Sequence, residues 1–142
     1  MIILDTNVVS ELFRPVPDPN VVSWLENLAG DAAITSITLA ELFAGVGRLP
    51  DGKRKSTLTA AVELVVRTYA DSQGILPFDH LAARYYADVV NRRANQGSPI
   101  STADAQIAAI CRAHDAVCAT RNTKDFLGTG VELVNPWESQ FF

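Results

Sequence analysis

The chain has 142 residues, of which 48% are hydrophobic and 20% charged, with a net charge of −4 and a pI near 5. This length is typical of one domain that buries roughly 70% of its unfolded surface, and no apolar run approaches the ~20 residues that a membrane-spanning helix needs. The acidic balance excludes a protein that coats nucleic acid through a generally basic surface, because such binding depends on Lys and Arg.

Short apolar strands alternate with helices along the chain, which predicts an α/β fold with a central, mostly parallel five-stranded sheet. In chain order, strands are expected over residues 2–4, 33–35, 75–76, 117–119 and 132–134. Helices are expected over residues 8–13, 21–28, 38–48, 54–71, 81–95 and 102–114. The Pro- and Gly-rich connections are short enough to be loops within a single domain that spans residues 1–142.

The first strand is too short and too acidic to be a targeting signal, because Asp5 interrupts it and no basic residue stands before it. We therefore expect a cytoplasmic protein without a membrane partner. Cys111 and Cys118 lie in apolar stretches with no C-x-x-C spacing and no nearby His pair. This pattern predicts buried thiols and argues against zinc ligands or a disulfide framework.

Four carboxylates stand where a predicted strand ends or a predicted helix begins. Asp5 follows the first strand directly, and Glu41 lies in the first turn of the helix after the second strand. Asn122 and Asp125 follow the fourth strand, while Asp104 opens the last long helix. Ligands of parallel α/β sheets bind outside the carboxyl ends of the strands, so we expect these groups on the functional edge.

Helical periodicity predicts an interior position for one of these acids and an exposed position for another. Asp104 shares a stripe with Ile107 and Cys111, which predicts that it points toward the interior. An ionised carboxylate there is costly unless it is paired or binds a metal. Glu41 lies roughly opposite the apolar stripe that contains Leu42, so its helix alone predicts an exposed side chain.

Each acid also has a purely structural explanation. Asp5 can cap the helix that follows it. The spacings from Thr38 to Glu41 and from Ser101 to Asp104 both have the form of a capping box. Asp125, the fourth acid, can be a turn residue between Asn122 and Phe126.

Gathered carboxylates without His or Cys suit a hard cation, Mg²⁺ or Mn²⁺, which accepts one or two carboxylates together with substrate phosphate. The natural reaction is phosphodiester hydrolysis by a metal-activated water, with no protein nucleophile. The sequence has no G-x-S-x-G motif and no phosphate-binding P-loop, and His80 and His114 are isolated residues at the start and the end of helical segments.

These segments resemble the PIN-domain nucleases, and within that family the VapC-type ribonuclease toxins of toxin–antitoxin pairs. Residues 4–8, 36–42 and 102–108 look like the segments that carry the family's first three acids. Residues 120–126 are similar to its closing motif, and residues 133–137 to the ending of its FitB-like branch. The resemblance covers essentially the whole chain.

The resemblance implies a three-layer PIN-like fold and an endoribonuclease that depends on Mg²⁺ or Mn²⁺. It also implies a homodimer and inhibition by a small antitoxin, whose DNA-binding domain would be the chain's only link to DNA. The implied catalytic and metal-binding residues are Asp5, Glu41, Asp104 and Asp125, with Thr6, Asn7, Thr120 and Asn122 in supporting roles.

The fourth acidic position departs from the family pattern, because many relatives place Asp where this chain has Asn122, with Asp125 three residues later. Operation with one metal or with two is therefore left open. Arg121 and Lys124 flank this position and are expected to contact RNA phosphates. The runs 53–55 and 92–93 are also basic, and a solvated helix face is the favoured interpretation of both.

Two other functions fit parts of the sequence. A haloacid-dehalogenase-like phosphatase would use Asp5 as nucleophile, although its D-x-D pattern is broken here by Asn7. A catalytically inactive domain would keep the fold and bind an antitoxin or another protein, with Trp137, Phe141 and Phe142 as contact residues.

Overall fold

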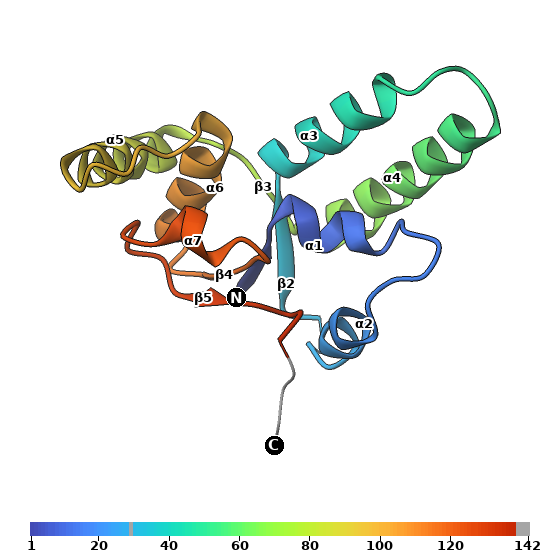
Figure 1. The fold of residues 1–142 in the computed structure, drawn as a ribbon, viewed down its shortest axis with the longest axis horizontal. Helices are drawn as coiled ribbons and strands as arrows, with labels where there is room; N and C mark the ends of the chain where they lie inside the picture. Colours follow the sequence, from blue (N-terminus) through green and yellow to red (C-terminus); the bar gives the residue numbers. More distant parts are fainter. Residues whose placement is uncertain (29, 139–142) are drawn as a thin grey trace.

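A computed structural model describes residues 1–28 and 30–138 and contains a five-stranded sheet. The strands are β1 (Ile2–Leu4), β2 (Ala32–Thr35), β3 (Ile75–Leu76), β4 (Val117–Ala119) and β5 (Leu133–Val134). They lie in the order β3-β2-β1-β4-β5, and every neighbouring pair is parallel (Figure 1). The predicted α/β fold is confirmed, and each predicted strand is correct to within one residue.

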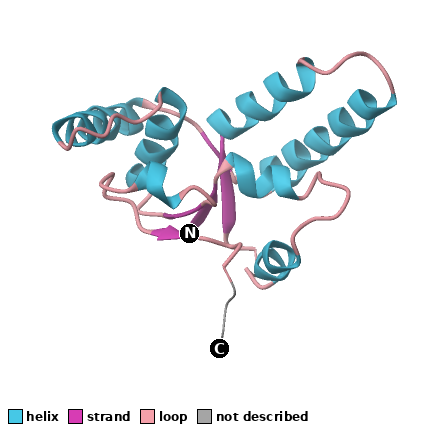
Figure 2. Ribbon diagram, in the orientation of Figure 1, coloured by secondary structure: helices cyan, strands magenta, loops and turns pink. Residues whose placement is uncertain are grey.

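Seven helices connect the strands in the described part of the chain (Figure 2). They are α1 (Thr6–Glu11), α2 (Pro19–Glu26), α3 (Ser36–Gly47), α4 (Lys53–Asp71), α5 (His80–Asn95), α6 (Thr102–Ala113) and α7 (Thr123–Phe126). The short helix α7 was not predicted, and it occupies the segment where a turn around Asp125 was expected.

The sheet has a separate hydrophobic core on each face, because neighbouring residues of a strand point to opposite sides. Ile3 and Cys118 face a cluster built mainly from α5 and α6. Leu4 and Ala119 face a second cluster, to which α1, α2, α3 and α4 contribute. The result is the predicted three-layer arrangement, with α5, α6 and the short helix α7 on one side of the sheet and α1, α2, α3 and α4 on the opposite side (Figure 1).

The helix caps confirm two structural predictions and correct a third. Asp5 caps α1 by accepting a hydrogen bond from the Thr6 amide, and Ser101 caps α6 through the Asp104 amide. The cap of α3 is Thr35, whose hydroxyl accepts from the Thr38 amide. The capping box predicted at Thr38 is therefore wrong, because α3 begins two residues earlier than expected.

The predictions for the two cysteines and for Trp137 agree with the structure. Cys111 and Cys118 are free and buried. Trp137 packs partly buried against the second core cluster, whereas Phe141 and Phe142 lie outside the described residues. None of the helices in the described ranges has the length and apolar character needed to cross a membrane.

Candidate metal and active site

The predicted acids converge at the carboxyl edge of the sheet, where β1, β2 and β4 end. Asp5 directly follows the central strand β1 and is only 5% exposed. Asp104 lies half-buried in the first turn of α6, at the rim of the site and less deeply placed than expected. Glu41 on α3 and Asp125 on α7 are exposed.

Three donors hold the Asp5 carboxylate in one orientation. The Thr6 amide donates to Oδ1 over 2.8 Å, and the Thr120 hydroxyl donates to Oδ2 over 2.8 Å. Asn7 Nδ2 donates to the same Oδ2 over 3.1 Å. Thr120 follows β4, the neighbour of β1, so two adjacent strand ends hold this one acid. Thr6, Asn7 and Thr120 thus occupy the positions expected of supporting residues.

A row of threonines links Glu41 to the sheet. Thr6 Oγ1 lies 2.7 Å from Glu41 Oε1 and 3.1 Å from Thr38 Oγ1. A hydroxyl carries one proton, so Thr6 donates to the carboxylate and accepts from Thr38. Thr38 and Thr35 are both fully buried. Sequence reasoning missed these two hydroxyls, although two threonines at the end of a strand and in the next helical turn are a visible signal.

Electrostatic repulsion links neighbouring members of the four acids. Burial, opposed by the hydrogen bonds from Thr120 and Thr6 and reinforced by Asp104 and Glu41, raises the pKa of Asp5 from 3.8 to about 6. Burial also raises the pKa of Asp104, and the charges of Asp125 and Glu41 add to that effect. The site therefore carries repelling negative charge that a bound cation would neutralise.

Among the described residues, Arg93 is the one basic side chain that is buried beside this cluster. It is 5% exposed and donates from Nε to the Ser98 carbonyl over 2.7 Å and from Nη1 to the Asp125 carbonyl over 2.6 Å. The solvated face predicted for residues 92–93 is wrong for Arg93, while Arg92 is exposed. Arg93 lies four residues after Val89 on the buried stripe of α5, and this spacing was the signal for the burial of Arg93.

The segment after β4 carries the remaining predicted site residues. The Asn122 amide donates to Thr120 Oγ1 over 3.1 Å, and Asn122 precedes α7, which contains Asp125 and Lys124. Arg121 and Lys124 are both exposed. Within the described ranges, no Lys or Arg forms an ion pair with any of the four acids.

The donor set suits a hard divalent cation, since it consists of carboxylate and hydroxyl oxygens. Among residues 1–28 and 30–138, no three His, Cys, Asp or Glu side chains already stand close enough to hold one ion together. Mg²⁺ does not require three, because it keeps several waters and takes one or two carboxylates together with substrate phosphate. Asp5 and Asp104 are the two acids of the cluster whose pKa values are raised by burial and by neighbouring acids, so deprotonation of both would be favoured by a bound cation.

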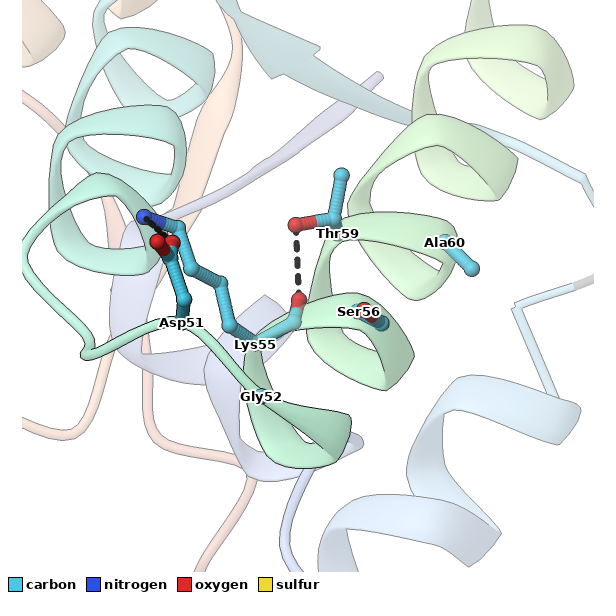
Figure 3. A pocket seen from close by; sticks show the side chains of 6 residues that line it. All are labelled: Asp51, Gly52, Lys55, Ser56, Thr59 and Ala60. Carbon is cyan, nitrogen blue, oxygen red and sulfur yellow. Dashed lines mark hydrogen bonds and ion pairs between the residues drawn. The ribbon is translucent and has the colours of Figure 1, made fainter.

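A cavity of about 250 Å³ opens beside Thr6 and Glu41, and its far wall includes Arg54 and Leu58 of α4. A different cavity lies at the start of α4, and none of the predicted site residues lines it (Figure 3). There Lys55 pairs with Asp51 over 3.5 Å. This pairing leaves Lys53 and Arg54 as the basic side chains of the run 53–55 without an acidic partner in the described ranges.

Comparison with known proteins shows a family resemblance over most of the chain. Residues 2–130 match the family described as PIN domain. The chain is 40% identical to the VapC ribonuclease Y4jK of Sinorhizobium fredii over 139 residues, which are 97% of this chain and 99% of that protein. It is 41% identical to the toxin FitB of Neisseria gonorrhoeae over 138 residues, 96% of this chain and 99% of that one.

Solved structures agree with the sequence comparison. A structure of FitAB bound to the IR36 DNA fragment contains a chain that superposes with a TM-score of 0.92 at 39% sequence identity. The superposition covers 99% of this chain and 99% of the other. The similarity therefore extends over the whole fold, including the edge of the sheet where the acids gather.

Proposed function

The chain belongs to the PIN domain family, and from this premise we propose that it is a metal-dependent endoribonuclease toxin neutralised by a cognate antitoxin. The observation that carries the proposal is the convergence of the four acids at one edge of the sheet, with Asp5 buried and held by three donors. Full-length similarity to a VapC ribonuclease and to the toxin FitB supports the reaction and the biological role.

In this proposal Asp5 and Asp104 hold Mg²⁺ or Mn²⁺, and Glu41 and Asp125 complete the acidic site. The cation would activate a water for attack on an RNA phosphodiester and offset the charge of the departing oxygen. Thr120 and Asn7 keep the Asp5 carboxylate oriented through hydrogen bonds to Oδ2.

The other side chains have more limited roles. Thr6 orients Glu41 through its hydroxyl. Asn122 supports Thr120 through its backbone amide, and its neutral side chain cannot supply a negative charge, so we assign the fourth acidic role to Asp125 in this proposal. Lys124 and Arg121 supply exposed positive charge beside the acids, where RNA phosphates would otherwise be repelled.

We propose that the biological unit is a homodimer in the cytoplasm and that residues 1–142 form a single nuclease domain. The antitoxin would bring the complex to DNA, consistent with the structure of the related FitAB bound to a DNA fragment. Light scattering of the purified chain, alone and with the product of a short neighbouring reading frame, tests the dimer and the antitoxin separately.

The central test is inducible expression of the wild-type chain and of the variants Asp5→Asn and Asp104→Asn. We expect growth arrest and RNA cleavage from the wild type alone, with cleavage in vitro restored by Mg²⁺ or Mn²⁺ and abolished by chelator. Asp71→Asn, at the exposed end of α4, is the matched control and should behave as the wild type. If the Asp5→Asn and Asp104→Asn variants were as toxic as the wild type, the acids would not carry out the reaction.

The two alternatives give different outcomes in the same assay. A phosphatase with Asp5 as nucleophile would form a covalent phosphoenzyme and leave RNA intact. An inactive binding domain would keep its cellular effect after Asp5→Asn. The orientation of Asp5, with both oxygens already accepting hydrogen bonds, favours a ligand or positioning role over nucleophilic attack.

A further inference from the structure

A stacked pair of side chains lies at the acidic edge on the side of β5. The guanidinium carbon of Arg121 is 5.2 Å from the ring centroid of Trp137. Arg121 follows Thr120 just after β4, and Trp137 stands three residues after β5. Because β4 and β5 are parallel, both side chains lie at the same edge of the sheet as Asp5.

Hydrogen bonds fix the backbone of both members of the pair. The Arg121 amide donates to Asn7 Oδ1 over 3.2 Å, and Asn7 also donates to Asp5. The Trp137 carbonyl accepts from Asn20 Nδ2 over 3.1 Å. The stack is thereby connected, through Asn7, to the carboxylate that is expected to bind the metal.

The charge of Arg121 is not used for an ion pair within the described residues. The side chain is exposed, and its guanidinium carbon lies over the indole ring of Trp137. Cation–π contact holds the planar group in place and leaves its other face and its N–H edge toward solvent. A planar, exposed cation beside an acidic catalytic edge suits a ligand that is both flat and anionic.

Single-stranded RNA has these two properties. Proteins recognise it by stacking unpaired bases on aromatic rings or on Arg guanidinium planes, while cations contact the backbone. We propose that Arg121, supported by Trp137, forms a stacking subsite for an unpaired nucleotide of the RNA, next to the scissile phosphate. This subsite rests on the proposed ribonuclease function and adds a substrate-positioning role for a residue pair.

Trp137 also packs against the second core cluster, so a purely structural role would make the pair an anchor for the chain after β5. The two roles are separable. An anchor lowers thermal stability when it is removed and leaves RNA affinity of the folded protein unchanged. A stacking subsite lowers RNA affinity under conditions in which the protein stays folded.

The test measures binding without cleavage, in an Asp5→Asn background. Replacing Trp24 by Phe leaves Trp137 as the sole tryptophan, since the chain has two. Titration with a short single-stranded RNA should quench its fluorescence. Arg121→Ala should weaken binding by about tenfold and reduce the salt dependence by about 0.7 in the log–log slope, the value for one phosphate contact on a single strand.

Two further variants make the result specific. Arg121→Lys keeps the charge but loses the planar stack, so it should retain the salt slope and still lose several-fold in affinity. Arg67→Ala removes an exposed arginine from α4 and is the matched control, with unchanged quenching and affinity. Thermal denaturation of each variant confirms that the protein remains folded at the titration temperature.

The proposal is overturned if RNA leaves the fluorescence of Trp137 unchanged, or if Arg121→Ala binds RNA as tightly as Arg67→Ala. It is also overturned if antitoxin quenches Trp137 while RNA does not, since the surface would then belong to a protein partner. None of these outcomes affects the nuclease proposal, which is tested separately by RNA cleavage with the wild-type chain and with the Asp5 and Asp104 variants.

Discussion

Arg93 donates a hydrogen bond from its guanidinium to the main-chain carbonyl of Asp125, over 2.6 Å. The same side chain reaches the Ser98 carbonyl, in the loop that leads to α6 and Asp104. One buried cation therefore ties together the segments that carry two of the four acids. It also stabilises the charged form of Asp104, whose pKa is lowered by Arg93 against the larger effect of burial.

Arg93→Ala should lower the free energy of unfolding by about 2–4 kcal/mol, because two carbonyls lose their donor in a buried position. Urea denaturation measures the loss. Arg93→Lys should lose less, since an ammonium group keeps the charge. Arg92→Ala is the matched control on the exposed side of α5, where the pair with Asp88 is screened by solvent and contributes little to stability. Equal losses at positions 92 and 93 would contradict the positioning role.

The raised pKa of Asp5 predicts how stability depends on pH without metal. The folded protein holds this proton up to about pH 6, whereas the unfolded chain releases it near 3.8. The free energy of unfolding should therefore fall as pH rises through that window, by up to about 3 kcal/mol from this group. Asp104 acts in the same direction.

The comparison with Asp5→Asn isolates this effect, since other titrating groups are shared by both proteins. Among them, Asp79 and Asp88 have lowered pKa values and give the opposite slope. Chemical denaturation in chelator at intervals from pH 4 to pH 7 should show the wild type losing stability relative to the variant. A constant difference across this range would mean that Asp5 titrates normally.

Metal binding should offset the loss of stability that accompanies deprotonation of Asp5 and Asp104. Mg²⁺ or Mn²⁺ binds the deprotonated carboxylates, so it should raise the melting temperature at pH 7.5 and do so much less at pH 5. Asp5→Asn and Asp104→Asn should show little shift at either pH, while Asp71→Asn should respond as the wild type. A metal-induced shift that survives both substitutions would place the ion elsewhere.

Thr120 offers a substitution of nearly constant shape. Its buried hydroxyl donates to Asp5, so Thr120→Val removes one hydrogen bond from the charged carboxylate and leaves the packing in place. Loss of this bond, which favours the charged form, should raise the pKa of Asp5 further. The acidic limb of the pH–activity profile should therefore move to higher pH, and Thr120→Ser should keep it at the wild-type pH. An unshifted profile in the valine variant would exclude this role.

The fourth acidic position can be resolved by two substitutions on one short segment. Asp125→Asn removes a charge that acts on Asp104, so we expect cleavage to need severalfold more Mg²⁺. Asn122→Ala keeps the backbone amide that supports Thr120 and should leave the metal requirement nearly unchanged. Metal titrations of RNA cleavage compare the two, and a larger effect at position 122 would reverse the assignment.

The strands and long helices follow from local sequence because hydrophobic periodicity and caps are local. Helix α3 begins earlier than predicted because two threonines compete for the cap, and Thr35 has the position at the strand end. Helix α7 has four residues, too few for a periodic pattern. Arg93 was assigned to solvent because charge suggests exposure, whereas its buried partners are carbonyls that no side-chain pattern records.

The connection between Asp5 and Thr120 also orders events during synthesis. Asp5 is made before the hydroxyl that orients it, which comes 115 residues later, after β4. Strand β1 has β4 as one of its two neighbours, so an unfinished chain lacks half the pairing of its central strand as well as Asp104 and Thr120. The proposed active site is therefore incomplete until β4 and Thr120 have been made, which leaves time for a partner to be made alongside the chain.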